Sequence, residues 1–184
     1  MRQTRTALAA PLAFALALGL AAPAALAGGP VVLTVTGAVE KANRGPVDAA
    51  EDKLFVFNDV DFAKAHEFDL DALAALPQAK ARADFPMGGE TVEFTGPLLA
   101  DVLAAAGAAG DKLSVQAMDG YAIEVTRDEL TERGAVVATA RDGKPLGIGG
   151  FGPTQIVFPR ADRAELAEMN DDWWIWQIYH IKVE

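Results

Sequence analysis

The chain has 184 residues, of which 51% are hydrophobic and 23% charged, a composition typical of a folded domain and not of a disordered segment. Its 26 acidic side chains outnumber its 16 basic ones, for a formal charge of −10, and this excess argues against nucleic-acid binding because few cations are present to neutralise phosphates. The absence of cysteine excludes disulfides, a cysteine nucleophile and thiolate-ligated metal sites.

The N-terminus has the three parts of a secretory signal peptide. Arg2 and Arg5 form a positively charged start, residues 7–20 are almost wholly Ala, Leu and Phe, and the small-residue site Ala25-Leu26-Ala27 follows. This order predicts a signal peptide over residues 1–27, cleaved after Ala27.

A retained membrane anchor is the alternative for this segment, but interruptions at Pro11 and Pro23 favour cleavage. The remaining domain, residues 28–184, then carries a charge of −12, because the leader holds two Arg and no acids. A secreted domain of this size that lacks cysteine fits a bacterial periplasm, with no part embedded in the membrane after cleavage.

Residues 28–107 alternate between strand and helix signals. Asp69 is a suitable N-cap for a short helix, Pro97 fits the first turn of another, and Gly107 is a candidate C-terminal cap. Leu54–Phe57 is a short apolar run. The expected strands are Val31–Val39 and Thr91–Thr95, and the expected helices are Leu70–Leu76 and Pro97–Leu103.

Residues 108–184 are richer in strand signals. Asp119-Gly120 lies between two alternating runs and predicts a β-hairpin, and a similar turn occurs at Asp142-Gly143. The expected strands are Leu113–Ala117, Tyr121–Val125, Ala135–Ala140, Gln155–Phe158 and Trp173–Val183, with a short helix at Ala161–Met169. The sequence therefore predicts one α+β domain with more strand than helix.

Few residues carry a recognisable catalytic pattern. Ser114 is the single serine and has no nucleophile-elbow sequence, which argues against a serine triad. His66 is expected to be solvated and His180 to be a partly buried structural residue, and no grouping suits zinc. The glycine-rich loop Gly147–Gly152 is not a phosphate-binding motif, so it is either a mobile loop or a loop that covers a ligand.

Three tryptophans lie close together near the C-terminus. Core packing is one explanation, but a core does not easily hold all three indoles, because every buried indole N–H needs a partner. Stacking of an indole on a flat heterocycle is the other explanation. In an extended strand Trp174 and Trp176 share one face and Trp173 points to the other. We therefore expect Trp174, nearer the open start, to stack on a ligand, or Trp173 if the pocket lies on the other face. We expect Trp176 to be a wall of the core. Asp171 and Asp172 could accept hydrogen bonds from the stacked ring.

An ordered set of short blocks gives the chain a family resemblance. The blocks are VTGAV (35–39), FDLDALAALP (68–77), TGPLLADVL (95–103), AMDGYAIEV (117–125), DGKPL (142–146), GPTQIVFP (152–159) and WQIYHIKV (176–183). With them, residues 31–183 resemble the oxidoreductase molybdopterin-binding domain, which implies the sulfite-oxidase fold. Enzymes of that family hold molybdenum through a cysteine thiolate, and an arginine often follows the Gly-Pro turn. This chain has no cysteine and has Gln155 near that position, so the resemblance implies a pterin pocket with molybdenum unlikely.

A small secreted branch of the same fold, the PruR-type periplasmic pterin-binding proteins, is similar in length, leader and missing cysteine. This resemblance implies a non-catalytic protein that binds a reduced pterin such as a tetrahydropterin. It also implies a partner, the periplasmic domain of a membrane diguanylate cyclase/phosphodiesterase. The alternatives are a molybdopterin-dependent oxidoreductase with an oxygen ligand, and an interaction module without a ligand. The resemblance places the pterin among Arg82, Phe85, Asp119, Tyr121, Gly150, Phe151, Gly152, Trp173, Trp174 and Trp176.

Overall fold

The computed structural model describes residues 28–184. The predicted signal peptide and its cleavage site after Ala27 lie outside the described residues. Within the described part of the chain, the helices are all too short or too polar to cross a membrane.

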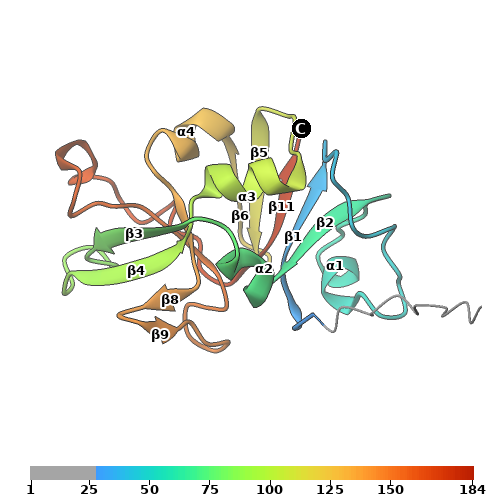
Figure 1. The fold of residues 1–184 in the computed structure, drawn as a ribbon, viewed down its shortest axis with the longest axis horizontal. Coiled ribbons are helices and arrows are strands. Elements are labelled where there is room, and N and C mark those ends of the chain that lie inside the picture. Colours follow the sequence, from blue (N-terminus) through green and yellow to red (C-terminus); the bar gives the residue numbers. More distant parts are fainter. Residues whose placement is uncertain (1–27) are drawn as a thin grey trace, which may run out of the picture.

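A five-stranded sheet forms the centre of the domain (Figure 1). Its strands lie in the order β2-β1-β11-β5-β6, so the first and last strands of the domain are neighbours. β1 and β11 pair in parallel, with Val35 opposite Ile181, and the other pairs are antiparallel. The bounds are β1 Val31–Gly37, β2 Ala65–Asp69, β5 Lys112–Ala117, β6 Ala122–Thr126 and β11 Ile178–Val183.

Short helices cover one face of this sheet. In α3 (Leu99–Ala106) the side chains of Leu99, Val102 and Leu103 are buried in the main core, and the helix ends at Gly107, which adopts the left-handed conformation with φ 63°. α2 (Leu70–Ala74) begins at Asp69, whose carboxylate accepts a hydrogen bond from the Ala72 N–H. α4 is Arg127–Thr131.

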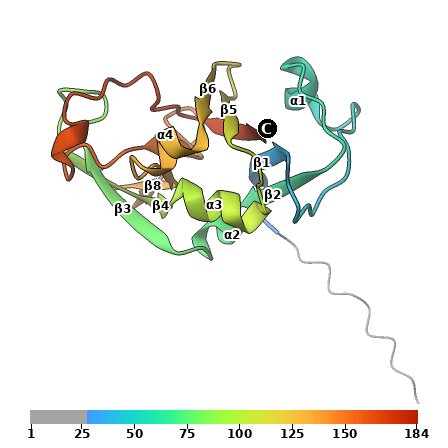
Figure 2. The same cartoon turned by 90° about the horizontal axis from the view of Figure 1, so that it is seen from above.

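The opposite face of the sheet is polar and is covered by a separate segment. Figure 2 places α1 (Lys53–Phe57) and α3 on opposite sides of the sheet. The apolar run predicted at 54–57 thus forms a helical turn, and its Phe55 packs with Phe62 and Tyr179 in a small second core. This segment closes over buried sheet residues such as His180.

A second group of strands extends to one side of the central sheet (Figure 1). One sheet has the order β3-β4-β8-β9, and a pair joins β7 and β10. The bounds are β3 Gln78–Ala83, β4 Val92–Pro97, β7 Val136–Ala138, β8 Ala140–Arg141, β9 Lys144–Pro145 and β10 Gln155–Val157. Pro97 therefore ends β4. The prediction that it lies in the first turn of the helix is wrong, because α3 begins at Leu99.

Two predicted elements are much shorter than expected. The helix predicted at Ala161–Met169 is a single 3₁₀ turn, Ala164–Leu166. The strand predicted at Trp173–Val183 begins only at Ile178, because Gln177 has φ 54° and an Asp171–Trp174 turn precedes it. The tryptophans therefore lie on irregular backbone, where alternation does not decide which way a side chain points.

Candidate functional site

A cavity of about 360 Å³ opens between the β5–β6 turn and the segment that leads into β11. One wall comes from the hairpin turn predicted at Asp119-Gly120, where Gly120 has φ 91° and the Tyr121 N–H donates to Asp119 Oδ1 at 2.9 Å. The other wall comes from residues 171–176. The lining residues are Ala117, Asp119, Tyr121, Asp171, Asp172, Trp174, Ile175 and Trp176.

Trp174 is a wall of this cavity and not a free stacking platform. Its side chain is 1% exposed. The Phe85 ring stacks on it with centroids 5.3 Å apart and planes 5° apart, and the Arg160 guanidinium carbon lies 4.5 Å from the indole centre. The predicted stacking role of Trp174 is therefore wrong, because these neighbours already cover the ring.

Trp176, and not Trp174 as predicted, takes the exposed position. It is 43% exposed at the cavity and Tyr121 is 51% exposed, so these two rings are the accessible aromatic surfaces there. Phe151 supports Trp176 edge-to-face, with centroids 6.1 Å apart. The expectation that Trp176 is a wall of the core is wrong, because the chain does not continue as an extended strand through Gln177.

The three carboxylates of the cavity are not equally free. Both oxygens of Asp171 are engaged, by Arg160 Nη1 at 2.8 Å and by the Met87 N–H at 2.7 Å. Asp119 accepts the Tyr121 N–H at one oxygen, and Asp172 accepts Asn170 Nδ2 at one oxygen at 2.7 Å. Asp119 and Asp172, both exposed, each keep an oxygen for an N–H donor of a ligand.

Arg160 is buried and organises the inner side of the site. Its Nε donates to Asp84 Oδ1 at 2.6 Å, its Nη2 to the Asp84 carbonyl at 2.9 Å, and its Nη1 to the Met169 carbonyl at 2.6 Å. Burial alone would raise the pKa of Asp84, but the Gly88 N–H and the Arg160 guanidinium outweigh it and lower that pKa. The ion pair with Arg160 holds Asp171 in place, and the cation–π contact of the same guanidinium holds Trp174.

The structure brings six of the ten predicted site residues together. Asp119, Tyr121, Trp174 and Trp176 line the cavity. Phe85 and Phe151 do not line it but contact two of the lining tryptophans.

The other four do not line the cavity. Arg82 is exposed and pairs with Asp162 at 3.5 Å. Trp173 packs under Arg133, whose guanidinium carbon is 5.0 Å from the ring. The Gly150 carbonyl accepts Gln177 Nε2 at 2.8 Å, and a Cβ at Gly152 would stand 2.3 Å from the Leu146 carbonyl carbon. Gly152 is therefore needed for the close approach of the Leu146 backbone, whereas Gly150 contributes only its backbone carbonyl.

Sequence reasoning missed three residues of the site. Ala117 and Ile175 line the cavity but have no functional group that marks them. In the sequence Arg160 is only a cation that follows an apolar strand. No pattern in the adjacent residues indicates that Asp84 and Asp171 are its partners. Asp171 and Asp172 are marked in the sequence by their place directly before the tryptophans.

The two histidines lie outside this cavity. His180 is 4% exposed, with Nε2 at 2.8 Å from Thr36 Oγ1 and Nδ1 at 3.3 Å from Gln116 Oε1, which confirms its structural position. Burial, with the nearby Lys182 charge, lowers the pKa of His180 to about 4. His66 is half-buried and not freely solvated, because it bonds the Lys41 carbonyl at 2.5 Å.

The donor set does not suit a molybdenum centre of the thiolate type. The sequence has no cysteine, and within residues 28–184 no three His, Asp or Glu side chains gather as a metal site requires. No reaction step through such a metal can be assigned to these residues.

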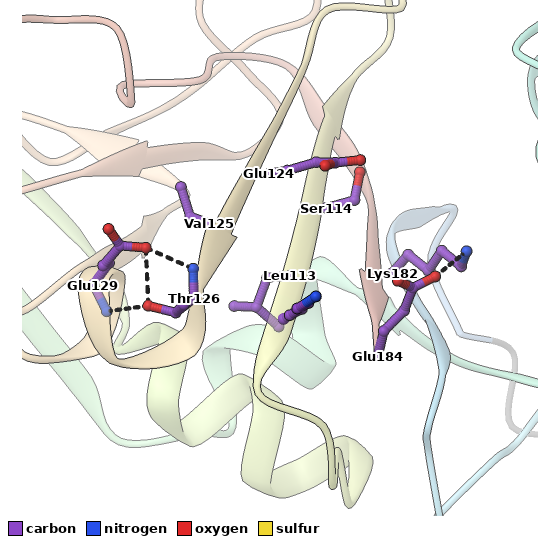
Figure 3. Close-up of a pocket in the computed structure, with 9 residues that line it drawn as sticks. Leu113, Ser114, Glu124, Val125, Thr126, Glu129, Lys182 and Glu184 are labelled. Carbon is purple, nitrogen blue, oxygen red and sulfur yellow. Dashed lines mark hydrogen bonds and ion pairs between the residues drawn. The ribbon is translucent and has the colours of Figure 1, made fainter.

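A second hollow of about 340 Å³ lies on the central sheet (Figure 3). Its charged groups are largely occupied by one another: Lys182 pairs with Glu184, and Glu129 caps α4 through Thr126. None of its nine lining residues is aromatic, so it has no surface on which a flat ring could stack. It is not a candidate for a heterocycle site.

Comparison with solved structures settles the fold. The chain superposes on the sulfane dehydrogenase SoxCD from Paracoccus pantotrophus with a TM-score of 0.55 and 17% identity, covering 82% of this chain and 37% of that one. The chain has a sulfite-oxidase-like fold. It spans well under half the length of that structure, and at this identity the likeness concerns the fold alone. No family model matches the sequence. No curated protein matches it either.

Proposed function

We propose that this protein is a periplasmic, non-catalytic pterin-binding protein that relays pterin availability to the periplasmic domain of a membrane diguanylate cyclase/phosphodiesterase. One observation carries the proposal: the cavity joins an accessible aromatic surface, Trp176 with Tyr121, to two carboxylates with unused oxygens.

This combination suits the ring face and the N–H edge of a pterin. The flat ring stacks on an indole, and its 2-amino and ring N–H donors match carboxylate acceptors. Asp119 and Asp172 supply such acceptors beside Trp176. A cavity of about 360 Å³ is within the range of small-molecule sites.

Support for the relay comes from exposed apolar groups beside the cavity. Tyr121 and Trp176 are exposed at the cavity, and α1 approaches the same β5–β6 turn, since Asn58 Oδ1 lies 3.1 Å from where a Gly120 Cβ would stand. Phe57, at the end of α1, is 78% exposed. Exposed apolar side chains of this kind suit a partner that senses whether the cavity is filled.

The periplasmic location rests on the leader. We expect the exported protein to begin at Gly28, since the A-x-A site ends at Ala27. Mass measurement of protein recovered from the periplasm tests this, and an intact mass that includes Met1 would contradict it.

Calorimetric titration tests the binding proposal. Tetrahydropterin is expected to bind at one site per chain, and a lumazine, which lacks the 2-amino group, is expected to bind more weakly because the carboxylates lose a donor. No heat on adding tetrahydropterin to well-folded protein would overturn the proposal.

A further inference from the structure

Two side chains near the cavity have buried polar atoms without a hydrogen-bond partner. Among the described residues, such atoms occur on Arg127, Gln155 and Trp174. Arg127 is otherwise well bonded, since its Nη2 donates to the Ala108 and Gly110 carbonyls. Trp174 lines the cavity, and its Nε1 is a donor without an acceptor. Gln155 stands apart because neither its Nε2 nor its Oε1 has a partner.

Gln155 lies next to the cavity wall. It is 0% exposed in β10 and sits opposite Trp176 in an isolated antiparallel bridge. Directly opposite residues in an antiparallel pair point to the same face, so its side chain shares a face with that of Trp176. The following Ile156 N–H donates to the carbonyl of Ile175, another lining residue, at 2.8 Å.

An unpaired amide in this place lowers the stability of the folded chain. A leucine or methionine would fill a similar volume without leaving a buried donor and acceptor unsatisfied. A buried amide without a hydrogen-bond partner is explained if a bound ligand supplies that partner.

We propose that Gln155 is a ligand contact of this cavity, reached past the half-exposed Trp176 side chain, and that the Trp174 N–H assists it. The amide presents a donor and an acceptor in one plane, which matches a cyclic amide edge where an N–H adjoins a C=O. Trp174 Nε1 adds a donor for a second acceptor on the same ring. This inference rests on the proposed function and assigns to Gln155 the hydrogen bonds to the cyclic amide edge of the ligand.

Gln155→Leu tests the inference, with Gln78→Leu as the matched control. Gln78 lies outside the cavity, and its Nε2 donates to the Leu73 and Leu76 carbonyls at 2.9 and 2.8 Å. Each variant is melted without ligand and titrated with tetrahydropterin. Gln155→Leu is expected to melt at or above the wild-type temperature and to bind about tenfold more weakly or worse, whereas Gln78→Leu keeps wild-type affinity.

Three outcomes overturn the inference, and they are distinguishable. Wild-type affinity in Gln155→Leu removes Gln155 from the site and leaves the proposed function standing. A clearly lower melting temperature of ligand-free Gln155→Leu means that the amide already has a structural partner, such as a bound water. Absence of tetrahydropterin binding by the wild type overturns both this inference and the proposed function.

Discussion

The guanidinium carbon of Arg160 lies 4.5 Å from the centre of the Trp174 ring, inside the domain. The same guanidinium pairs with Asp84 at 2.6 Å and Asp171 at 2.8 Å, and Trp174 and Asp171 both line the cavity. One buried cation therefore sets the positions of an aromatic wall and a carboxylate wall. Removing it leaves both carboxylates without their countercharge.

We expect Arg160→Met to lower the free energy of unfolding by about 1–3 kcal/mol, because Asp84 and Asp171, which are partly exposed, lose their hydrogen bonds to a charged group. Arg160→Lys is expected to recover part of the loss, since lysine keeps the charge but not the planar fork that serves Asp84 and Asp171 together. Urea unfolding of the three proteins measures this. Equal stability of wild type and Arg160→Met would mean that the network contributes nothing.

Trp174→Ala and Trp176→Ala are expected to differ mainly in their effect on stability. Trp174 is buried, so its removal should cost about 3–5 kcal/mol of stability. Trp176 is 43% exposed, so its removal should cost little stability but weaken tetrahydropterin binding by about 1 kcal/mol or more. Melting curves and calorimetry on both variants check the two effects.

Trp173→Ala is the matched control for this pair, since Trp173 packs under Arg133 outside the cavity. It should bind as the wild type does. If Trp176→Ala also binds as tightly as wild type, Trp176 is not the stacking surface.

Stability is expected to fall as the pH is lowered from about 6.5 to about 4, in part because of His180. Its pKa is about 4 in the folded chain and about 6.5 when unfolded, so across this window the unfolded state binds the extra proton. Above pH 6.5 His180 is neutral in both states and costs no stability. As the pH falls below 6.5 the unfolded state is protonated first, and the loss of stability is complete when the pH has passed the folded pKa of about 4. The difference of 2.5 units corresponds to about 3 kcal/mol.

His180→Gln isolates this contribution, because glutamine keeps a polar group near Thr36 and Gln116 but does not titrate. Urea midpoints of both proteins are measured between pH 4 and 8. The wild type should lose more stability than the variant towards acid. Parallel pH profiles would show that His180 is accessible to protons in the folded state.

Local signals in the sequence predicted local structure well. The Asp69 cap, the left-handed Gly107 and the Asp119-Gly120 hairpin are confirmed, because each depends on a few neighbouring residues. The prediction of a strand over Trp173–Val183 is wrong at its start. Apolar residues at both odd and even positions give no sign of where the extended backbone is interrupted. The positive φ of Gln177 is set by packing against the Phe151 loop, whose carbonyl accepts the Gln177 N–H.

The site was less predictable than the fold for a related reason. Asp119 and Tyr121 both line the cavity, and a hairpin turn fixes their positions locally. The roles of Trp174 and Trp176 were exchanged, since exposure there depends on Phe85 and Arg160, which come from distant segments. Long-range ion pairs such as Arg160–Asp84 leave no pattern in a single sequence.

Mass spectrometry of small molecules released from protein purified out of its native compartment tests directly whether the chain carries a pterin. One reduced pterin, or its oxidised fluorescent product, is expected per chain, with no stoichiometric molybdenum in the same sample. Stoichiometric molybdenum, or well-folded protein that releases no pterin and gives no thermal shift with tetrahydropterin, would contradict it.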